Sequence, residues 1–168
     1  MNQSHPKRLA VTALLIAMEI VLSRFGSITT PIVKIGFEFL PVALTGMLYG
    51  PFYAGIAAAI ADVLGASLFP AGAFFPGFTL TAFLTGAAYG VFLYGHERSL
   101  LRVCLAVGVV NIALNIGLNT AWLQMITGKG YIALLPARVT KNLLMAPIQA
   151  SLIRLAASRK FFTVISRT

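Results

Sequence analysis

The chain of 168 residues has room for a single domain, and 58% of its residues are hydrophobic while only 10% are charged. Soluble domains carry about 25% charged residues, so this composition argues against a soluble enzyme, a disordered chain and a disulfide-stabilised secreted scaffold. The single cysteine, Cys104, also excludes an internal disulfide and a metal cage built from cysteines. The sequence therefore indicates an integral membrane protein, with a formal net charge of +9.

Glycine, proline and polar residues divide the chain into six predicted membrane-spanning helices. In chain order the expected spans cover residues 8–25, 37–49, 52–68, 78–95, 102–126 and 132–157. A span needs roughly 20 apolar residues, so we expect the short second and third spans to be tilted, kinked or shielded by neighbouring helices. The segments 26–36 and 68–77 are expected to be loops. We predict an all-α fold of six transmembrane helices in one membrane domain over residues 1–168.

The distribution of basic residues predicts the orientation of these helices. With six spans both termini lie on one side, and that side carries Lys7, Arg8, Arg98, Arg102, Arg154, Arg159, Lys160 and Arg167. The positive-inside rule then places both termini in the cytoplasm, so the basic excess indicates a membrane topology and not a nucleic-acid partner. The external side keeps five basic residues that the rule would deplete: Arg24, Lys34, Lys129, Arg138 and Lys141.

Polar side chains recur at helical spacing in the fifth and sixth spans. The fifth carries Asn111, Asn115, Asn119 and Trp122, and the sixth carries Arg138, Lys141, Asn142, Met145 and Gln149. The amides could act as hydrogen-bonding links between helices or as groups that bind a ligand. Two cations on one face of the sixth span favour an anionic ligand, because charges inside a membrane are costly and usually line a site.

Three acidic residues and a group of aromatic residues each have two interpretations. Glu19, Glu38 and Asp62 could pair with buried arginines or bind a donor-rich group on a ligand. Glu97 lies in a polar turn and is expected to be solvated. The aromatic residues near the external helix ends could form an interfacial belt or stack on a flat ligand. They are Phe25, Phe37, Phe39, Phe69, Phe74, Phe75, Phe78 and Trp122.

No catalytic or metal-binding motif is present: the chain lacks HExxH, Walker and GxSxG sequences and any pair of nearby histidines. We therefore expect no catalytic residues, no metal site and no resident cofactor. An enzyme is the poorest fit to the sequence. Uphill transport by such a chain would need an external motor or an ion gradient.

Two segments carry a family resemblance. Residues 30–41 read Thr-Pro-Ile-Val-Lys-Ile-Gly-Phe-Glu-Phe-Leu-Pro, after Ser23-Arg24-Phe25, and residues 69–80 read Phe-Pro-Ala-Gly-Ala-Phe-Phe-Pro-Gly-Phe-Thr-Leu. The chain resembles the folate-specific S components of energy-coupling factor (ECF) transporters over about residues 8–157. The spacing of Ala13 and Ala17 is similar to the AxxxA motif by which S components dock on their transmembrane coupling subunit.

The resemblance implies capture of folate from outside the cell, followed by association with a coupling subunit and two cytoplasmic ATPases. Loops 26–36 and 68–77 would gate the site. The external cations suit the glutamate of folate, the aromatic residues its ring, and the amides and carboxylates its pterin edge. The residues expected around folate are Arg24, Lys34, Glu38, Asp62, Phe74, Asn115, Asn119, Trp122, Arg138, Lys141 and Asn142.

Two other functions remain open at this point. The chain could be an S component for another B vitamin or its precursor, which competition by thiamine or riboflavin would reveal. It could also be a membrane-embedded assembly subunit without a ligand. In that case substitution of Arg138 and Lys141 would disturb complex formation, and no ligand binding would be detectable.

Overall fold

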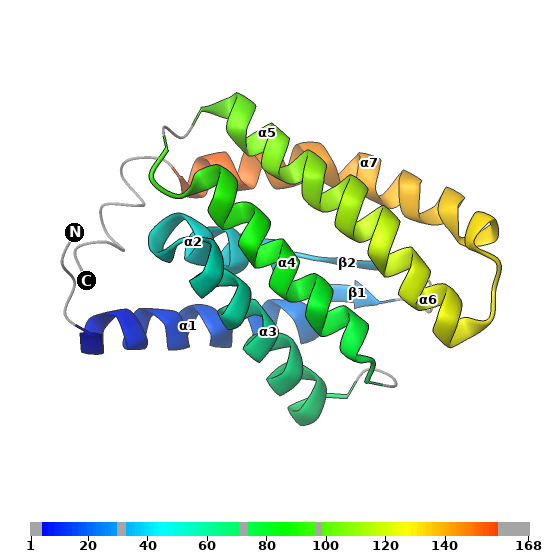
Figure 1. Ribbon diagram of the computed structural model, residues 1–168, viewed down its shortest axis with the longest axis horizontal. Coiled ribbons are helices and arrows are strands. Elements are labelled where there is room, and N and C mark those ends of the chain that lie inside the picture. The colour runs from blue at the N-terminus through cyan, green and yellow to red at the C-terminus, as the bar shows by residue number, and fades with distance from the viewer. Residues whose placement is uncertain (1–4, 30–32, 71–73, 97–98, 158–168) are drawn as a thin grey trace.

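The computed structural model describes residues 5–29, 33–70, 74–96 and 99–157 (Figure 1). These parts of the chain fold into helices packed around one short hairpin. The helices are α1 (His5–Arg24), α2 (Phe39–Tyr49), α3 (Pro51–Leu68), α4 (Pro76–Leu93), α5 (Leu100–Val109), η1 (Val110–Leu118), α6 (Asn119–Thr127) and α7 (Tyr131–Ala156). Helices α5, η1 and α6 are continuous and count as one, so the described residues contain six helical rods. Each rod begins and ends within three residues of the corresponding expected span.

Helix boundaries follow from local backbone chemistry. Gly50 adopts a positive φ of 89° that few other residues tolerate, and it separates α2 from Pro51 at the first turn of α3. Pro76 begins α4 in the same way. Gly128, in the left-handed region, ends α6.

Three of the described helical rods are long and apolar enough to cross a membrane: α3, α4 and the continuous α5–η1–α6. The apolar helix α2 is shorter, at 11 residues. The crossing of α1, α2 and α7 therefore stays a prediction. The N-terminal end of α1 and the C-terminal end of α7 lie at the same end of the molecule (Figure 1).

Residues 26–36 are not simply a loop, and the expectation of a purely all-α fold needs this correction. Strands β1 (Ser27–Thr29) and β2 (Lys34–Gly36) pair antiparallel, with Ile28 opposite Ile35. Strands of three residues are too short to show an alternating pattern in the sequence. The expected gate loops also include residues 30–32 and 71–73, which lie outside the described residues, as do Glu97, Arg98, Arg159, Lys160 and Arg167.

The middle of the fifth rod is π-helical, where the sequence predicts one continuous α-helix. This segment, η1, spans nine residues and contains Asn111 and Asn115. π-Helix is rare, is usually confined to a single turn, and is frequently found at functional sites. The departure therefore falls on the polar stripe of the fifth span.

Helices α2, α3 and α4 pack through glycines. A Cβ atom on Gly90 would collide with Pro51 Cα, and one on Gly86 would collide with the carbonyl oxygen of Ala54. A Cβ on Gly46 would lie 2.8 Å from the backbone nitrogen of Gly90. Small residues let membrane helices approach closely, so these glycines bring the three helices into direct backbone contact.

The first half of α1 is attached to this block by a cation–π contact. The guanidinium carbon of Arg8 lies 5.2 Å from the ring centre of Tyr49 and 5.3 Å from that of Tyr53. Ala13 and Ala17, further along α1, are exposed. The side of α1 that carries these alanines is therefore available for contact.

Candidate functional site: a charged cavity

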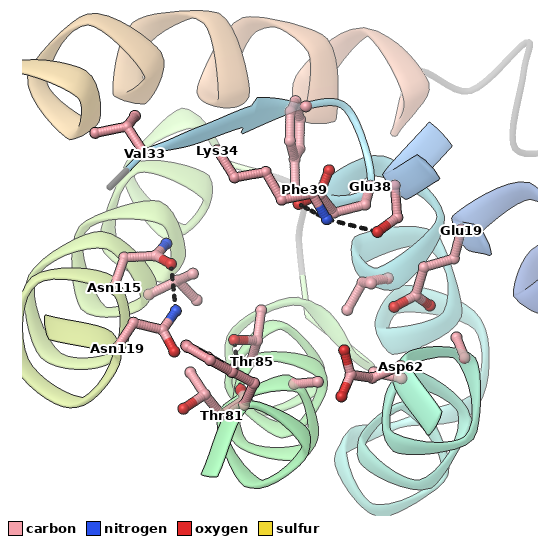
Figure 2. A pocket seen from close by; sticks show the side chains of 18 of the residues that line it. Glu19, Val33, Lys34, Glu38, Phe39, Asp62, Thr81, Thr85, Asn115 and Asn119 are labelled. Carbon is pink, nitrogen blue, oxygen red and sulfur yellow. Dashed lines mark hydrogen bonds and ion pairs between the residues drawn. The ribbon is translucent and has the colours of Figure 1, made fainter. Parts of the chain in front are cut away.

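One cavity of about 580 Å³ is bounded by residues from almost every element of the fold. Its size is typical of sites for drug-sized ligands. Figure 2 shows its wall from close by, with Asn115 and Asn119 on one side and Glu19 and Asp62 on the other. The charged residues that line it are Glu19, Arg24, Lys34, Glu38, Asp62, Arg138 and Lys141.

This cavity gathers most of the chain's acidic residues and most of its expected external cations. Three of the four acidic residues in the whole sequence line it, as do four of the five basic residues expected on the external side. Among the described cations of that side, Lys129 alone lies away from the cavity and is exposed. Charges inside an apolar chain are costly, so their concentration marks this cavity as the candidate site.

Lys34 is already neutralised by a partner within the protein. Its Nζ lies 3.3 Å from Glu38 Oε1 and donates a hydrogen bond of 2.6 Å to Ser23 Oγ. These contacts tie the hairpin to α1 and to the start of α2. Glu38 Oε2 is buried and has no hydrogen-bond partner among the described residues.

The amide side chains form a hydrogen-bonded row, of which Asn115, Asn119 and Gln149 line the cavity. Asn111 donates to Gln149 at 2.8 Å, Asn115 donates to Asn111 at 3.2 Å, and Asn119 donates to Asn115 at 3.1 Å. Asn111 and Gln149 are buried and link η1 to α7. At the other end Asn119 Oδ1 is buried and accepts no hydrogen bond from the described residues. This row of amides thus links η1 to α7 at one end, and at the other end the Oδ1 acceptor of Asn119 has no partner among the described residues.

Two cations on α7 face the cavity. Arg138 donates from Nη1 to the backbone carbonyl of Asn119 at 3.1 Å, and Lys141 lies three residues further along the helix. Neither forms an ion pair with an acid in the described part of the chain; the salt bridge found there joins Lys34 and Glu38. Their positive charges are therefore available to an anion.

Arg24 closes the cavity at the C-terminal end of α1. A Cβ atom on Gly65 of α3 would lie 3.2 Å from Arg24 Nε, so the missing side chain makes room for the guanidinium group. Arg24 Nε is buried and donates no hydrogen bond within the described ranges. This nitrogen is a donor without an acceptor beside the site.

Asp62 is held by a neighbouring helix. Thr79 Oγ1 of α4 donates to Asp62 Oδ2 at 2.7 Å, which fixes the carboxylate on the α3 side of the cavity. Thr81 and Thr85, also on α4, line the floor between Asp62 and the amides (Figure 2). No pattern in the sequence had selected these threonines.

Trp122 and Asn142, both expected around the ligand, lie outside the described lining of this cavity. Trp122 packs behind the wall, with its ring centre 5.7 Å from that of Phe75. The side chain of Asn142 is 3% exposed, and its Oδ1 is buried without a partner in the described chain. A shared helical face was too coarse a criterion, because it could not separate residues at the centre of a face from those at its edge.

The lining also includes residues outside the set expected around folate. Phe74, which belongs to that set, is 54% exposed and lines the cavity together with Phe39, Phe75 and Phe78. Glu19 and Ser23 also line it, from α1. The four-residue spacing between Glu19 and Ser23 was the available signal, since it places both on one face of a helix.

Sequence and structure comparisons place the chain in a known family. The family model described as ECF transporter, substrate-specific component, matches residues 7–156. The chain belongs to this family. It is 51% identical over 141 residues to a protein of Clostridium novyi named Folate transporter FolT, covering 84% of this chain and 82% of that one.

Further family members support the match. A protein of Leuconostoc mesenteroides, also named Folate transporter FolT, is 38% identical over 152 residues, covering 87% of this chain and 82% of the relative. The crystal structure of FolT bound with folic acid superposes with a TM-score of 0.87 at 43% identity, covering 92% of this chain and 94% of that chain. The fold described above is therefore that of a folate-binding relative.

Proposed function

We propose that this chain is the folate-binding subunit of an ECF-type importer, which captures folate outside the cell and delivers it with an ATP-driven module. The observation that carries the proposal is the cavity, which combines cations that form no ion pair and hydrogen-bond acceptors that have no donor among the described residues. Folate needs both, because it has a dianionic glutamate at one end and a pterin rich in N–H groups at the other. The folic acid bound by the structural relative supports the assignment.

The contacts within the cavity suggest which residues bind each part of folate. Lys34 is engaged by Glu38, so Arg24, Arg138 and Lys141 are the cations assigned to the glutamate. The pterin is assigned to the acceptors and amides on the two facing walls, and Phe74 to the face of a ring. The pterin group comprises Glu38, Asp62, Asn115 and Asn119.

The family of transporter components supports the proposed partners. The exposed pair Ala13 and Ala17 on α1 is assigned to docking on a transmembrane coupling subunit. ATP hydrolysis then belongs to two partner subunits, and the chain itself is a binding protein without catalytic residues or a resident cofactor. It spans the plasma membrane with both termini in the cytoplasm, and segments 26–36 and 68–77 gate the cavity.

Calorimetric titration of the purified, detergent-solubilised chain tests the proposal. Folic acid should bind with measurable heat at micromolar or lower concentration, while thiamine and riboflavin should neither bind nor compete. Absence of any heat with folic acid would overturn the assignment. Competition by another vitamin, but not by folic acid, would replace folate with that ligand.

A further inference from the structure

Charges around the cavity do not balance once folate is bound. Four cations, Arg24, Lys34, Arg138 and Lys141, face the three lining carboxylates of Glu19, Glu38 and Asp62. Folate brings two more carboxyl groups, which are ionised at neutral pH because carboxyl groups titrate near pH 4. Five carboxylates would then share the cavity with four cations. A net charge buried in a membrane protein is costly, so one carboxyl group is expected to be neutral.

Hydrogen bonding separates the three carboxyl groups of the protein. Glu38 is paired with Lys34 at 3.3 Å, and Asp62 accepts a hydrogen bond of 2.7 Å from Thr79. Both contacts stabilise an ionised carboxylate. Glu19 accepts no hydrogen bond and forms no ion pair within the described residues, although it lies on the same cavity wall.

The groups facing Glu19 come from every neighbouring element. Two of the closest are carboxylates: Asp62 on α3, whose side chain points into the same part of the cavity (Figure 2), and Glu38 before α2. The cations of the cavity are engaged elsewhere. Lys34 on β2 is paired with Glu38. Arg24 on α1 and the α7 residues Arg138 and Lys141 are assigned to the glutamate of folate. This arrangement leaves no cation among the described lining residues to pair with an ionised Glu19 beside Asp62.

We propose that Glu19 is a neutral carboxylic acid in the folate-bound cavity and binds the pterin through its O–H and C=O groups. This assignment rests on the proposed function and adds a residue to it. A neutral carboxyl group both donates and accepts a hydrogen bond, and so does one edge of a pterin. Asp62, which already accepts a hydrogen bond from Thr79, is assigned to N–H groups of the ligand. The two acids therefore recognise different parts of the heterocycle.

Folic acid titrations of Glu19→Gln and Glu19→Ala, from mildly acidic to alkaline pH, test this assignment. Glutamine keeps one donor and one acceptor without a charge, so it should restore at neutral pH most of the affinity that alanine loses, which we expect to be about tenfold. Wild-type affinity should fall as the pH rises, because binding needs the protonated acid. The affinity of Glu19→Gln should not fall in this way.

Asp62→Asn serves as the matched control, because the same change at a residue assigned only to accept hydrogen bonds removes an acceptor and should weaken binding. The proposal is wrong if Glu19→Gln binds as weakly as Glu19→Ala, or if its pH profile follows that of the wild type. If Glu19→Ala fails to fold, the comparison of wild type with Glu19→Gln decides the question. A wild type that binds no folic acid at any pH would instead refute the proposed function.

Discussion

The indole nitrogen of Trp122 donates a hydrogen bond to the hydroxyl group of Thr81 at 3.1 Å. That hydroxyl in turn donates to the carbonyl oxygen of Gly77 at 3.0 Å. Thr81 lines the cavity and Trp122 does not, so the tryptophan supports the wall from behind. Its hydrogen bond joins α6 to α4.

Trp122→Phe separates support of the wall from direct contact with folate. The variant keeps an aromatic ring but loses one partly buried hydrogen bond, worth about 1 kcal/mol. We expect thermal stability in detergent to fall by about that amount, with folic acid affinity changed by less than about threefold. Thr81→Ser, which keeps the hydroxyl, is the control. An affinity loss above about tenfold with unchanged stability would show that Trp122 stacks on the ligand.

Removal of Arg138 or Lys141 should weaken binding through the glutamate of folate alone. A hydrogen bond to a charged group contributes about 1.5–3 kcal/mol, so we expect the Kd of folic acid to rise about 10- to 100-fold in either alanine variant. Pteroic acid, which lacks the glutamate, should bind both variants as it binds the wild type. Lys129→Ala, outside the cavity, is the control. Equal losses of affinity for folic and pteroic acid would instead indicate that these cations contact the pterin end of the ligand.

Two glycines on neighbouring helices should respond oppositely to the same substitution. Gly90→Ala places a methyl group against the backbone of Pro51, which cannot move aside, so we expect a loss of more than about 2 kcal/mol or no folded protein. Gly108→Ala meets nothing within 4 Å and should stabilise α5 by up to about 1 kcal/mol. Thermal unfolding followed by circular dichroism measures both. Similar midpoints for the two variants would contradict the glycine-mediated packing.

Leucine at both Ala13 and Ala17 should separate partner docking from ligand binding. Both alanines are exposed, so the larger side chains fit the isolated subunit and folic acid affinity should be unchanged. Co-purification with the coupling subunit should fall sharply, because close helix approach needs small residues. Ala113→Leu, at another exposed alanine, is the control and should keep the complex intact. Loss of the complex in both variants would argue against a dedicated docking face.

Local sequence signals predicted the helical framework and several residues of the cavity. The break between α2 and α3 follows from Gly50-Pro51, a pair whose backbone preferences act within two residues. Four-residue spacing also linked Asn115 to Asn119, and both line the cavity. Such signals succeed because they depend on neighbours along one helix.

Features that depend on contacts between helices could not be predicted in this way. Glu19 and Asp62 are 43 positions apart, and only the packing of α1 on α3 brings them to one wall. The position of Trp122 behind the cavity wall could not be read from its own helix, because it depends on the contact with Thr81 of α4. The π-helical segment was missed because no residue pattern along Val110–Leu118 distinguishes it from an ordinary apolar helix.

The glycine contacts make α2, α3 and α4 one closely packed block, with backbone against backbone at Gly46, Gly86 and Gly90. Helix α1 lies along this block, attached at Arg8 and again through Leu15, which is buried with Leu44. Its far end borders the cavity at Ser23 and Arg24, and its middle carries the exposed Ala13 and Ala17. One helix thus connects the candidate ligand site with the surface assigned to a partner.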